Sequence, residues 1–477
     1  MSYRDRLAEI ARAPEGPAVA AFFDLDRTLI AGFSAQDVLV ERALAGDLRI
    51  DNLARAFAAA ARFGAGQIEF VEFVNGAAAD LAGRADSDNY AFGREVFENR
   101  VAQRIYPEAR ALVEAHRARG HTLAVVSSAT PYQVEPVAED LGIPHVMCTR
   151  LDVKDGVCTG RVATACYGTG KADAARNLAS ERGIDLAASY FYSDGREDLP
   201  LFEAVGNPRP LNPDARLAQI AQRRRWPVTR FESRGLPGPT DVARTALAFG
   251  AAVPASGAAL ANFLLNGSAR QSRNLFHALW AEMACAAAGI VLDVTGEEHV
   301  WSRRPAIFVF NHQSALDAVV LARLLRRDFA GVAKIEIARQ PIVGRIASML
   351  GTIFVDRGNT AQAIAALRPA VDALQRGTSV VIAPEGTRSP TPRLGRFKKG
   401  AFHLALQARA PMVPVVIHNT TDALPKGALV SHPAAIRVEV LAPIDTRPWR
   451  VETIDLHIAD VRSAFLRALG QVDLENP

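Results

Sequence analysis

The chain has 477 residues, which exceeds what one hydrophobic core usually supports, so we expect two or three domains. Hydrophobic residues make up 49% of the sequence and charged residues 22%, a composition that excludes an intrinsically disordered protein. The net charge of +4 is mild; it suits an anionic membrane surface or phosphorylated substrates, and we expect no nucleic-acid partner.

Cysteine usage and the N-terminus indicate the compartment. The chain has four cysteines, which are too few for a disulfide framework, and none of them shows CxxC spacing. The first residues, Met-Ser-Tyr-Arg-Asp-Arg, lack the apolar core of a signal peptide. We therefore expect a reduced protein that faces the cytoplasm.

Residues 1–235 carry the pattern of an α/β domain. Short apolar runs at 18–23, 122–126 and 188–192 are separated by long helix-like segments, which is typical of a parallel sheet with crossover helices. A helical stretch at about 35–105 is long enough to form a cap over an active site. Glycine, proline and arginine punctuate residues 205–240 and predict a domain boundary.

Two carboxylates follow the first apolar run of this domain. Asp24 and Asp26 stand two residues apart, so their side chains leave an extended backbone on the same side. Such a pair can bind a divalent cation and leave one carboxylate free to attack phosphorus. An acidic loop that merely caps a helix is the alternative.

Later residues favour the catalytic interpretation. Ser127 follows the second apolar run, and Lys171 follows Gly168-Thr169-Gly170 at an expected helix start. Asp194 and Asp198 follow the third run. In this order, over about residues 15–215, the features resemble the haloacid dehalogenase phosphatases, in the branch that contains phosphoserine phosphatase.

The resemblance implies a Rossmann-like core with a helical cap and assigns roles to these side chains. Asp24 becomes the nucleophile that forms an aspartyl-phosphate, and Asp26 becomes the general acid and then the base for water. Mg²⁺ is implied as cofactor, held by Asp24, the backbone carbonyl of Asp26 and Asp194, with Asp198 in the same acidic motif. Ser127 and Lys171 are expected to bind the phosphoryl group. The family often has Gly-Asp-Gly-x-Asn-Asp where this chain has Ser193 and Glu197, which leaves the aspartates in place.

Residues 236–295 are unusually apolar. No charged residue occurs from Thr245 to Leu265, and after Arg270 and Arg273 the run from Leu275 to Val294 is again mostly apolar. The length reaches the roughly 18 residues that a membrane helix needs. Pro254 and the glycines weaken a spanning helix, so a membrane-associated helical hairpin and a buried core hairpin both remain open.

Residues 296–477 predict a second α/β domain, with apolar runs at 306–310, 352–355, 379–383 and 412–417. His312 follows the first of these runs, and Asp317 lies five residues later. In a straight helix this spacing separates two side chains by about 140° around the axis, so they meet only if His312 lies in a loop. Residues 314–317 predict a capping box that starts a helix there, and Asp317 as a plain helix cap is the alternative.

Three further blocks favour a catalytic histidine. They are Gly351–Arg357, which ends in an arginine, Pro384–Ser389, with the sequence Pro-Glu-Gly-Thr-Arg-Ser, and the strand Met412–Val415. Together with the histidine motif, over about residues 275–440, they resemble the glycerolipid acyltransferases, especially the 1-acylglycerol-3-phosphate acyltransferases. Ala383 stands where the third block often has Phe, which affects an apolar packing position only.

This second resemblance implies acyl transfer from a thioester to an alcohol. His312 becomes the general base, and Asp317 fixes its tautomer. Arg357 and Arg388 suit a phosphate, Gly386 allows close approach of the backbone, and Glu385 and Thr387 complete the expected substrate-binding set. A basic cluster near residues 393–399 suits acyl-donor phosphates or lipid headgroups, or is a solvated loop.

These inferences lead to a bifunctional enzyme at the cytoplasmic face of the cell membrane, peripheral or monotopic. The expected partners are acyl-CoA or acyl carrier protein, lysophosphatidic acid, a phosphomonoester and the membrane surface. The alternative is mainly a phosphoserine phosphatase whose acyltransferase-like domain has a different acceptor.

Overall fold

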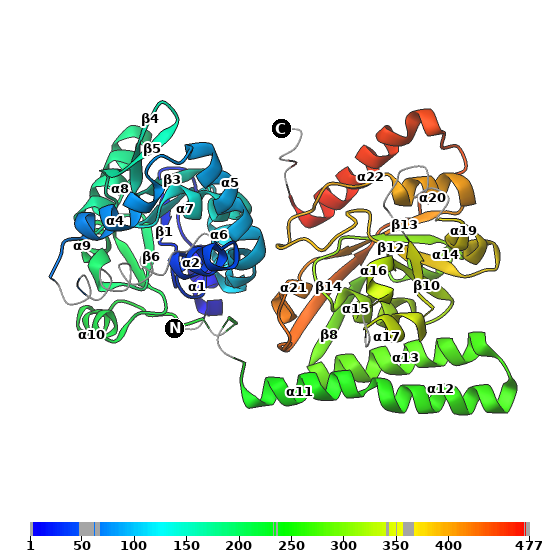
Figure 1. Cartoon of the computed structure of the whole chain (residues 1–477). Helices are drawn as coiled ribbons and strands as arrows, with labels where there is room; N and C mark the ends of the chain where they lie inside the picture. The colour runs from blue at the N-terminus through cyan, green and yellow to red at the C-terminus, as the bar shows by residue number, and fades with distance from the viewer. Residues whose placement is uncertain are drawn as a thin grey trace. The chain divides into compact units, whose positions relative to one another are not determined.

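The chain forms two compact units, Met1–Gly235 and Leu236–Pro477, each built around its own sheet (Figure 1). The computed structural model describes residues 3–46, 62, 67–231, 233–234, 237–339, 343–349, 351–355, 367–471 and 473. Both units are α/β, as the apolar runs predict, so each is considered by itself.

Five parallel strands form the sheet of the first unit, in the order β3-β2-β1-β6-β7. The strands are β1 (Ala20–Phe23), β2 (Thr122–Ser127), β3 (His145–Cys148), β6 (Tyr190–Ser193) and β7 (Asn207–Pro210). Alternate residues of β1 enter two separate cores: Phe23 packs in one and Phe22 in the other. A strand that is buried on both faces has a continuous apolar sequence, so β1 could be predicted from the sequence.

Helices supply both cores of this unit. The helices are α1 (Tyr3–Ile10), α2 (Ser34–Leu44), α4 (Phe70–Ala78), α5 (Asp86–Val96), α6 (Pro107–Ala118), α7 (Pro131–Leu141), α8 (Thr169–Arg182), α9 (Leu199–Ala204) and α10 (Ala215–Arg224). Residues from α6 and α7 line the core on one face of the sheet, and residues from α8, α9 and α10 line the core on the other.

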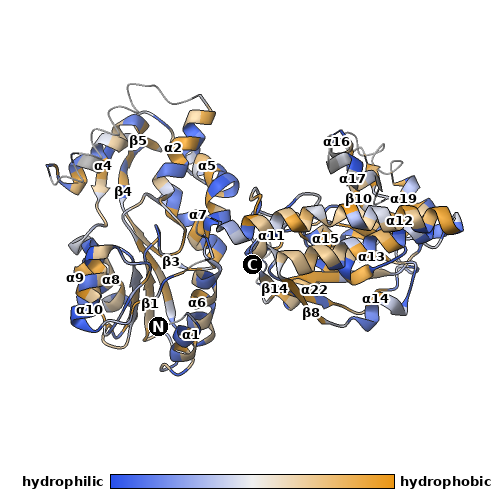
Figure 2. Ribbon diagram, turned by 90° about the horizontal axis from the view of Figure 1, so that it is seen from below, coloured by the Kyte–Doolittle hydropathy of each residue, from blue (hydrophilic) through white to orange (hydrophobic). Residues whose placement is uncertain are grey.

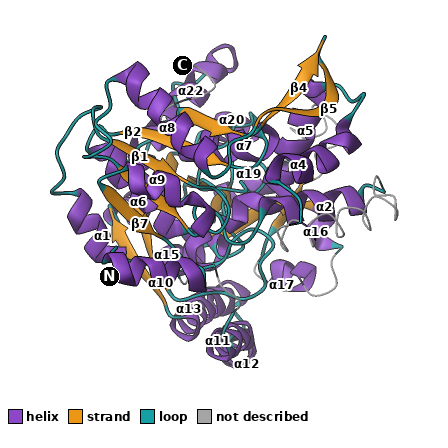
Figure 3. Cartoon of the chain, turned by 90° about the vertical axis from the view of Figure 1, so that its left-hand side faces the viewer, coloured by secondary structure: helices purple, strands orange, loops and turns teal. Residues whose placement is uncertain are grey.

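The expected helical cap is joined by a β-hairpin that the sequence analysis left unassigned. Strands β4 (Arg150–Lys154) and β5 (Val157–Thr164) pair antiparallel and lie beside α4 and α5 (Figure 3). The backbone of Cys158 exchanges two hydrogen bonds with the segment after α4, at Gly83 and Arg84. The sequence analysis missed the hairpin because each of its strands mixes buried and exposed residues and so contains no continuous apolar run.

The second unit has a mixed sheet of seven strands, in the order β11-β10-β12-β9-β13-β14-β8. The β13–β14 pair is antiparallel and the other pairs are parallel. The strands are β8 (Ile290–Thr295), β9 (Ile307–Phe310), β10 (Phe329–Lys334), β11 (Ile353–Val355), β12 (Ser379–Ile382), β13 (Met412–Ile417) and β14 (Ala434–Val440).

The central strand β9 again separates two cores. Phe308 packs with residues from α13 and α15 on one face, and Ile307 and Val309 pack with residues from α19, α20 and α22 on the other. The helices of this unit are α11 (Pro239–Gly250), α12 (Ala252–Asn266), α13 (Ala269–Ala288), α14 (Glu298–Ser302), α15 (Asp317–Leu325), α16 (Ile335–Ala338), α17 (Val343–Met349), α19 (Arg368–Gln375), α20 (Gly400–Ala408), α21 (Thr420–Ala423) and α22 (Ile454–Leu469).

The apolar segment after the boundary forms three helices. Helices α11 and α12 follow each other with only Ala251 between them, and α12 turns back into α13 at Gly267, whose φ is 67°. The apolar run predicted to continue to Val294 is divided: α13 ends at Ala288, and Ile290–Thr295 form the edge strand β8. Gly289, with φ 70°, ends the helix in a left-handed C-cap and allows the change.

Candidate active sites

The carboxyl ends of β1 and β6 bring the predicted phosphatase residues together. Lys171, in the first turn of α8, donates from Nζ to Asp24 Oδ1 at 2.7 Å and to Asp198 Oδ2 at 2.8 Å. All three side chains are buried. Residues far apart in sequence therefore meet because parallel strands end at the same edge of the sheet.

Burial controls the charges in this cluster. Loss of solvent raises the pKa of Asp24 to about 7, against the lowering effect of Lys171. Burial acts to lower the pKa of Lys171, but the carboxylates of Asp198 and Asp24 outweigh it and the pKa is raised. Lys171 therefore remains a cation that can neutralise a phosphoryl group.

Asp26 is held apart from this ion-pair cluster. Its Oδ1 accepts the backbone N–H of Ser34 at 2.7 Å, at the start of α2. Burial raises the pKa of Asp26, and the hydrogen bonds from Ser34 oppose the rise. A carboxyl group with a raised pKa suits proton donation to a leaving oxygen. The hydrogen bond from Ser34 ties Oδ1 of this carboxyl group to the start of α2.

Asp194 supplies a second buried carboxylate near Asp24, and its Oδ2 also pairs with Arg27 at 3.0 Å. Burial, followed by repulsion from Asp24, raises the pKa of Asp194 to about 8. Two buried carboxylates that repel each other fit a divalent cation, which takes oxygen ligands. Among the described residues no three His, Cys, Asp or Glu side chains form a metal cluster, so a cation here needs a backbone oxygen as well.

The remaining predicted phosphatase residues surround these groups. Asp198 accepts hydrogen bonds from Ser193 Oγ and Lys171, and its Oδ1 is buried without a partner in the described part of the chain. That oxygen fits a water bound to a cation. Ser127 lies at the end of β2, where its buried Oγ accepts the N–H of Ala129 at 3.2 Å.

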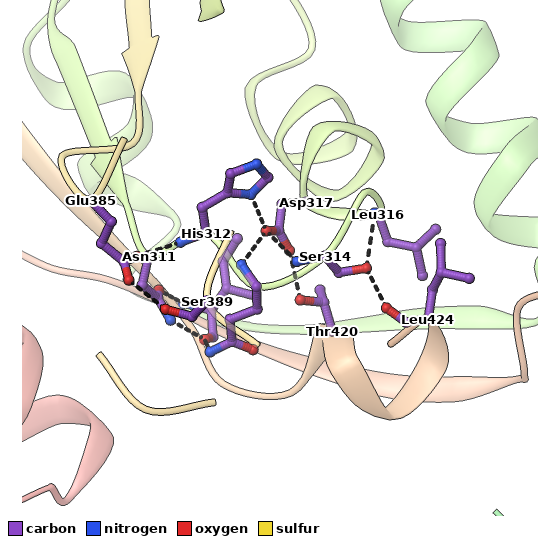
Figure 4. A network of polar contacts seen from close by, with 11 residues as sticks. Asn311, His312, Ser314, Leu316, Asp317, Glu385, Ser389, Thr420 and Leu424 are labelled. Atoms are coloured by element: carbon purple, nitrogen blue, oxygen red, sulfur yellow. Dashed lines mark hydrogen bonds and ion pairs between the residues drawn. The ribbon is translucent and has the colours of Figure 1, made fainter. Parts of the chain in front are cut away.

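The second site is built where β9 ends. His312 Nδ1 lies 2.7 Å from Asp317 Oδ2, as Figure 4 shows, and the histidine side chain keeps 28% of its surface exposed. His312 lies in the loop and Asp317 opens α15, which is the arrangement that their spacing requires. Because a carboxylate only accepts, Nδ1–H is the donor, and in the neutral imidazole Nε2 is then the nitrogen with the free lone pair.

Four hydrogen-bond donors hold the carboxylate of Asp317 in place. Besides His312, its Oδ2 accepts the N–H groups of Gln313 at 2.7 Å and Ser314 at 2.9 Å. Its Oδ1 accepts the hydroxyl of Thr420 at 2.6 Å. The predicted capping box does not form: the helix begins at Asp317, whose side chain reaches back, and Ser314 Oγ donates to Leu424 O.

Thr420 was missed by the sequence analysis. It lies in α21, just after β13, and its side chain is fully buried. A lone threonine about a hundred residues away carries no local signal, and only the pairing of β9 with β13 places it beside Asp317. Asn311 strengthens this connection through two hydrogen bonds with the backbone of Ile417.

Glu385 joins the loop that contains His312 to the block Pro384–Ser389. Its Oε1 accepts the N–H of His312 at 2.7 Å, and its Oε2 accepts Ser389 Oγ and the N–H of Gly395, each at 2.8 Å. Burial raises its pKa. Since both oxygens are occupied by the chain itself, the geometry makes Glu385 a residue that positions His312.

The other members of this block lie at the surface of the loop. Gly386 has φ 75°, a backbone conformation that favours glycine, and Thr387 is exposed. Arg388 is half-buried and has no ion pair within the described residues, so its charge is available to an anion. Arg357, the other predicted phosphate ligand, lies outside the described residues.

Each of the two domains matches a known family. Residues 21–203 match the haloacid dehalogenase-like hydrolase family, and residues 291–418 match the acyltransferase family. A probable phosphatase from Mycobacterium tuberculosis is 34% identical over 292 residues, which cover 54% of this chain and 96% of that protein. The chain belongs to the haloacid dehalogenase-like hydrolases and carries an acyltransferase domain at its C-terminal end.

Other relatives match part of the chain. A phosphoserine phosphatase of M. tuberculosis is 34% identical over 262 residues, covering 53% of this chain and 82% of the relative. A 1-acyl-sn-glycerol-3-phosphate acyltransferase from Limnanthes alba is 37% identical over 182 residues, 38% of this chain. The acyltransferase domain spans only 64% of the length of that plant protein. The solved 1-acyl-sn-glycerophosphate acyltransferase of Thermotoga maritima is 25% identical, covers 48% of this chain and 93% of its own, and has a TM-score of 0.43.

Proposed function

We propose that the acyltransferase domain acylates lysophosphatidic acid to phosphatidic acid, with acyl-CoA or acyl carrier protein as the thioester donor. The observation that carries this proposal is the 2.7 Å contact between His312 Nδ1 and Asp317 Oδ2 beside a partly exposed imidazole. The name of the plant relative supports the choice of acceptor. Arg388 and the predicted role of Arg357 supply the charge that an acceptor phosphate needs.

The proposed reaction needs two proton transfers, and His312 would carry out both. His312 Nε2 takes the proton of the acceptor hydroxyl while that oxygen attacks the thioester carbonyl. The new C–O bond forms, the C–S bond breaks, and the imidazolium returns the proton to the leaving thiolate. Asp317 stabilises the imidazolium, and its four hydrogen bonds keep it from moving.

For the hydrolase domain we propose hydrolysis of a phosphomonoester through an aspartyl-phosphate. Asp24 attacks phosphorus, and Asp26 protonates the leaving oxygen and then activates water. Ser127 and Lys171 hold the phosphoryl oxygens. Mg²⁺ held by Asp24, Asp194 and the carbonyl of Asp26 would offset the negative charge of the phosphoryl group.

We further propose that the chain works at the cytoplasmic face of the cell membrane. Pro239–Asn266 is the one helical segment of the described chain that is long and apolar enough to cross a membrane, and only 11% of its apolar window is buried. Leu264 is 75% exposed and Leu265 is 87% exposed, along the α11–α12 arm drawn in Figure 2. A lipid surface would cover these side chains and present lysophosphatidic acid to the same domain.

One experiment tests the acyl transfer. Purified full-length protein is assayed with acyl-CoA and acyl carrier protein donors against lysophosphatidic acid, other lysophospholipids and glycerol 3-phosphate. We expect lysophosphatidic acid to be preferred and His312→Ala to lose at least about a thousandfold in rate, because the general base is removed. Full acyl transfer by His312→Ala would refute the base assignment.

Phosphate release, measured in parallel, distinguishes a bifunctional lipid enzyme from a protein that is mainly a phosphoserine phosphatase. Phosphoserine and phosphatidic acid are offered to the same preparation. A protein that hydrolyses phosphoserine rapidly and acylates none of the lysolipids is mainly a phosphoserine phosphatase, with an acyltransferase domain of a different acceptor. The name of the M. tuberculosis phosphoserine phosphatase is the observation that favours this second candidate.

A further inference from the structure

Arg27 lies inside the nucleophile loop, yet the proposed mechanism gives it no role. It follows Asp26 directly, and its Nη1 lies 3.0 Å from Asp194 Oδ2. The Arg27 side chain is 37% exposed, whereas that of Asp194 is 12% exposed. A cation from the rim of the site therefore pairs with one of the two carboxylates that fit a divalent cation.

The backbone around Arg27 is arranged to keep it there. Its φ is 57°, a left-handed conformation that L-residues other than Asn and Asp seldom adopt. Asn212 Nδ2 donates to the carbonyl of Arg27 at 2.9 Å, and the Arg27 N–H donates to Gly32 O at 3.1 Å. A disfavoured conformation persists only when its surroundings fix it, and here two hydrogen bonds do so.

The Arg27 guanidinium is partly exposed, and besides its ion pair with Asp194 its Nη2 donates to Asn212 O at 3.5 Å. A guanidinium does not lose its proton in proteins, so the group at Asp194 stays positive. The Arg27 guanidinium carbon also lies 5.9 Å from the centre of the Phe33 ring, which offers a second contact at the rim. If the ion pair with Asp194 breaks, the contacts with Phe33 and Asn212 O remain to hold the side chain.

We propose that Arg27 is a built-in counter-cation that competes with the divalent cation for Asp194 and so sets the metal affinity of the hydrolase domain. This inference rests on the proposed function, which assigns Asp194 as a ligand. A single and a double positive charge about 5 Å apart oppose each other by roughly tenfold in binding even when water screens them. Arg27 would thus keep the site from binding metal too tightly while cancelling the charge of Asp194 when no metal is bound.

Calorimetric titration of metal-stripped full-length protein with MgCl₂ tests the proposal. We expect Arg27→Gln to bind Mg²⁺ about tenfold more tightly than the unmodified chain, because the competing charge is gone. Arg27→Lys keeps a charge and should stay closer to the original affinity. Arg196→Gln is the matched control: it removes an exposed arginine of the neighbouring acidic loop that has no ion pair in the described residues, and should change the affinity by less than about twofold.

The melting temperature in EDTA shows whether each variant folds. Arg27→Met, which keeps the aliphatic stem, replaces Arg27→Gln if the latter is unstable. Equal or weaker Mg²⁺ binding in the neutral variants overturns the inference while leaving the proposed function in place. Absence of Mg²⁺ binding by every form, the unmodified chain included, overturns both the inference and the metal-dependent mechanism.

Discussion

Thr420 shows how one hydroxyl completes a site at the scale of a single residue. Asp317 is a fully buried carboxylate, and such a group is tolerated only when its oxygens are hydrogen-bonded. Three donors form hydrogen bonds to Oδ2 of Asp317. The hydroxyl of Thr420 donates to the other oxygen, Oδ1, at 2.6 Å. Thr420 touches no reacting atom and acts through Asp317, which makes it a positioning residue.

Thr420→Val should lower kcat of acyl transfer by roughly tenfold or more, because a hydrogen bond to a charged group contributes about 1.5–3 kcal/mol. KM for the acceptor should change little, since the residue does not face substrate. Thr420→Ser keeps the hydroxyl and should restore most of kcat. Steady-state kinetics of the two variants check this expectation, and a serine variant as slow as the valine variant would contradict it.

At the scale of elements, a buried chain of hydrogen bonds joins α6, the turn before β2 and strand β6. His121 Nε2 lies 2.7 Å from the carbonyl of Pro14, so that nitrogen must be the donor. His121 Nδ1 is then the acceptor of His116 Nδ1–H at 2.8 Å, and His116 Nε2 accepts Tyr192 O–H at 2.8 Å. No member of this chain has room for another proton.

The hydrolase domain should therefore lose stability in acid. Burial, and next the neighbouring His121, hold the pKa of His116 well below 6.5. Below pH 6.5 the unfolded chain gains a proton at this histidine and the folded chain does not, so the free energy of unfolding falls by about 1.4 kcal/mol per pH unit. At pH above 6.5 the group contributes no pH dependence.

Calorimetric unfolding at pH 7.5 and about 5.5 measures this effect. The drop in melting temperature of the hydrolase transition should be smaller in His116→Gln, which cannot titrate, than in the unmodified chain. His299→Gln removes a histidine from the other unit and serves as the control. An undiminished acid sensitivity in His116→Gln would assign the effect to other groups.

The α11–α12 arm is anchored to its own unit by polar contacts, while its apolar side chains face outward. Thr245 Oγ1 accepts the N–H of Ser431 at 3.0 Å, and both side chains are buried. Asp241 lies 3.4 Å from His432. The exposed leucines of α12 therefore follow directly on a helix, α11, that these contacts fix to the rest of its unit.

Replacing Leu264 and Leu265 by glutamine should reduce binding to phosphatidylcholine–phosphatidylglycerol vesicles by at least about tenfold, because apolar burial in the lipid is lost. Leu456→Gln changes a leucine on α22 that is 65% exposed and should leave vesicle binding unchanged. Co-sedimentation with vesicles measures all three proteins. Equal binding by the double variant would exclude these residues from the lipid contact.

At the scale of the whole molecule, the two candidate sites lie in two units with separate sheets and cores. Every hydrogen bond described above for Asp24 or His312 stays within its own unit. The two reactions therefore need no shared side chain, and either site can be removed by itself.

Asp24→Asn should abolish phosphate release, by at least about a thousandfold, because the amide cannot form the acyl-phosphate. Acyl transfer by the same protein should stay within about twofold of the original rate, since no contact of His312 is lost. Paired assays on one preparation check this. A parallel fall of acyl transfer would show that the sites are coupled.

Buried strands and strand-end motifs were predictable. The runs that ended at Phe23, Phe310 and Ile417 became strands buried along their whole length, where an unbroken apolar sequence is the only one that fits. Edge elements were not predictable to the same degree. Strand β8 was taken as part of a helical hairpin, because its residues 290–295 alternate between buried and exposed after a long apolar helix.

The sequence by itself determined the two α/β units, the aspartates of the first site and the histidine–aspartate pair of the second, because these depend on local periodicity and short spacing. Only the tertiary structure decided that Thr420 holds Asp317, that Arg27 pairs with Asp194 and that Glu385 supports His312. These partners come from strands or loops distant in the chain. Their contacts follow from strand order and burial, which no local pattern encodes.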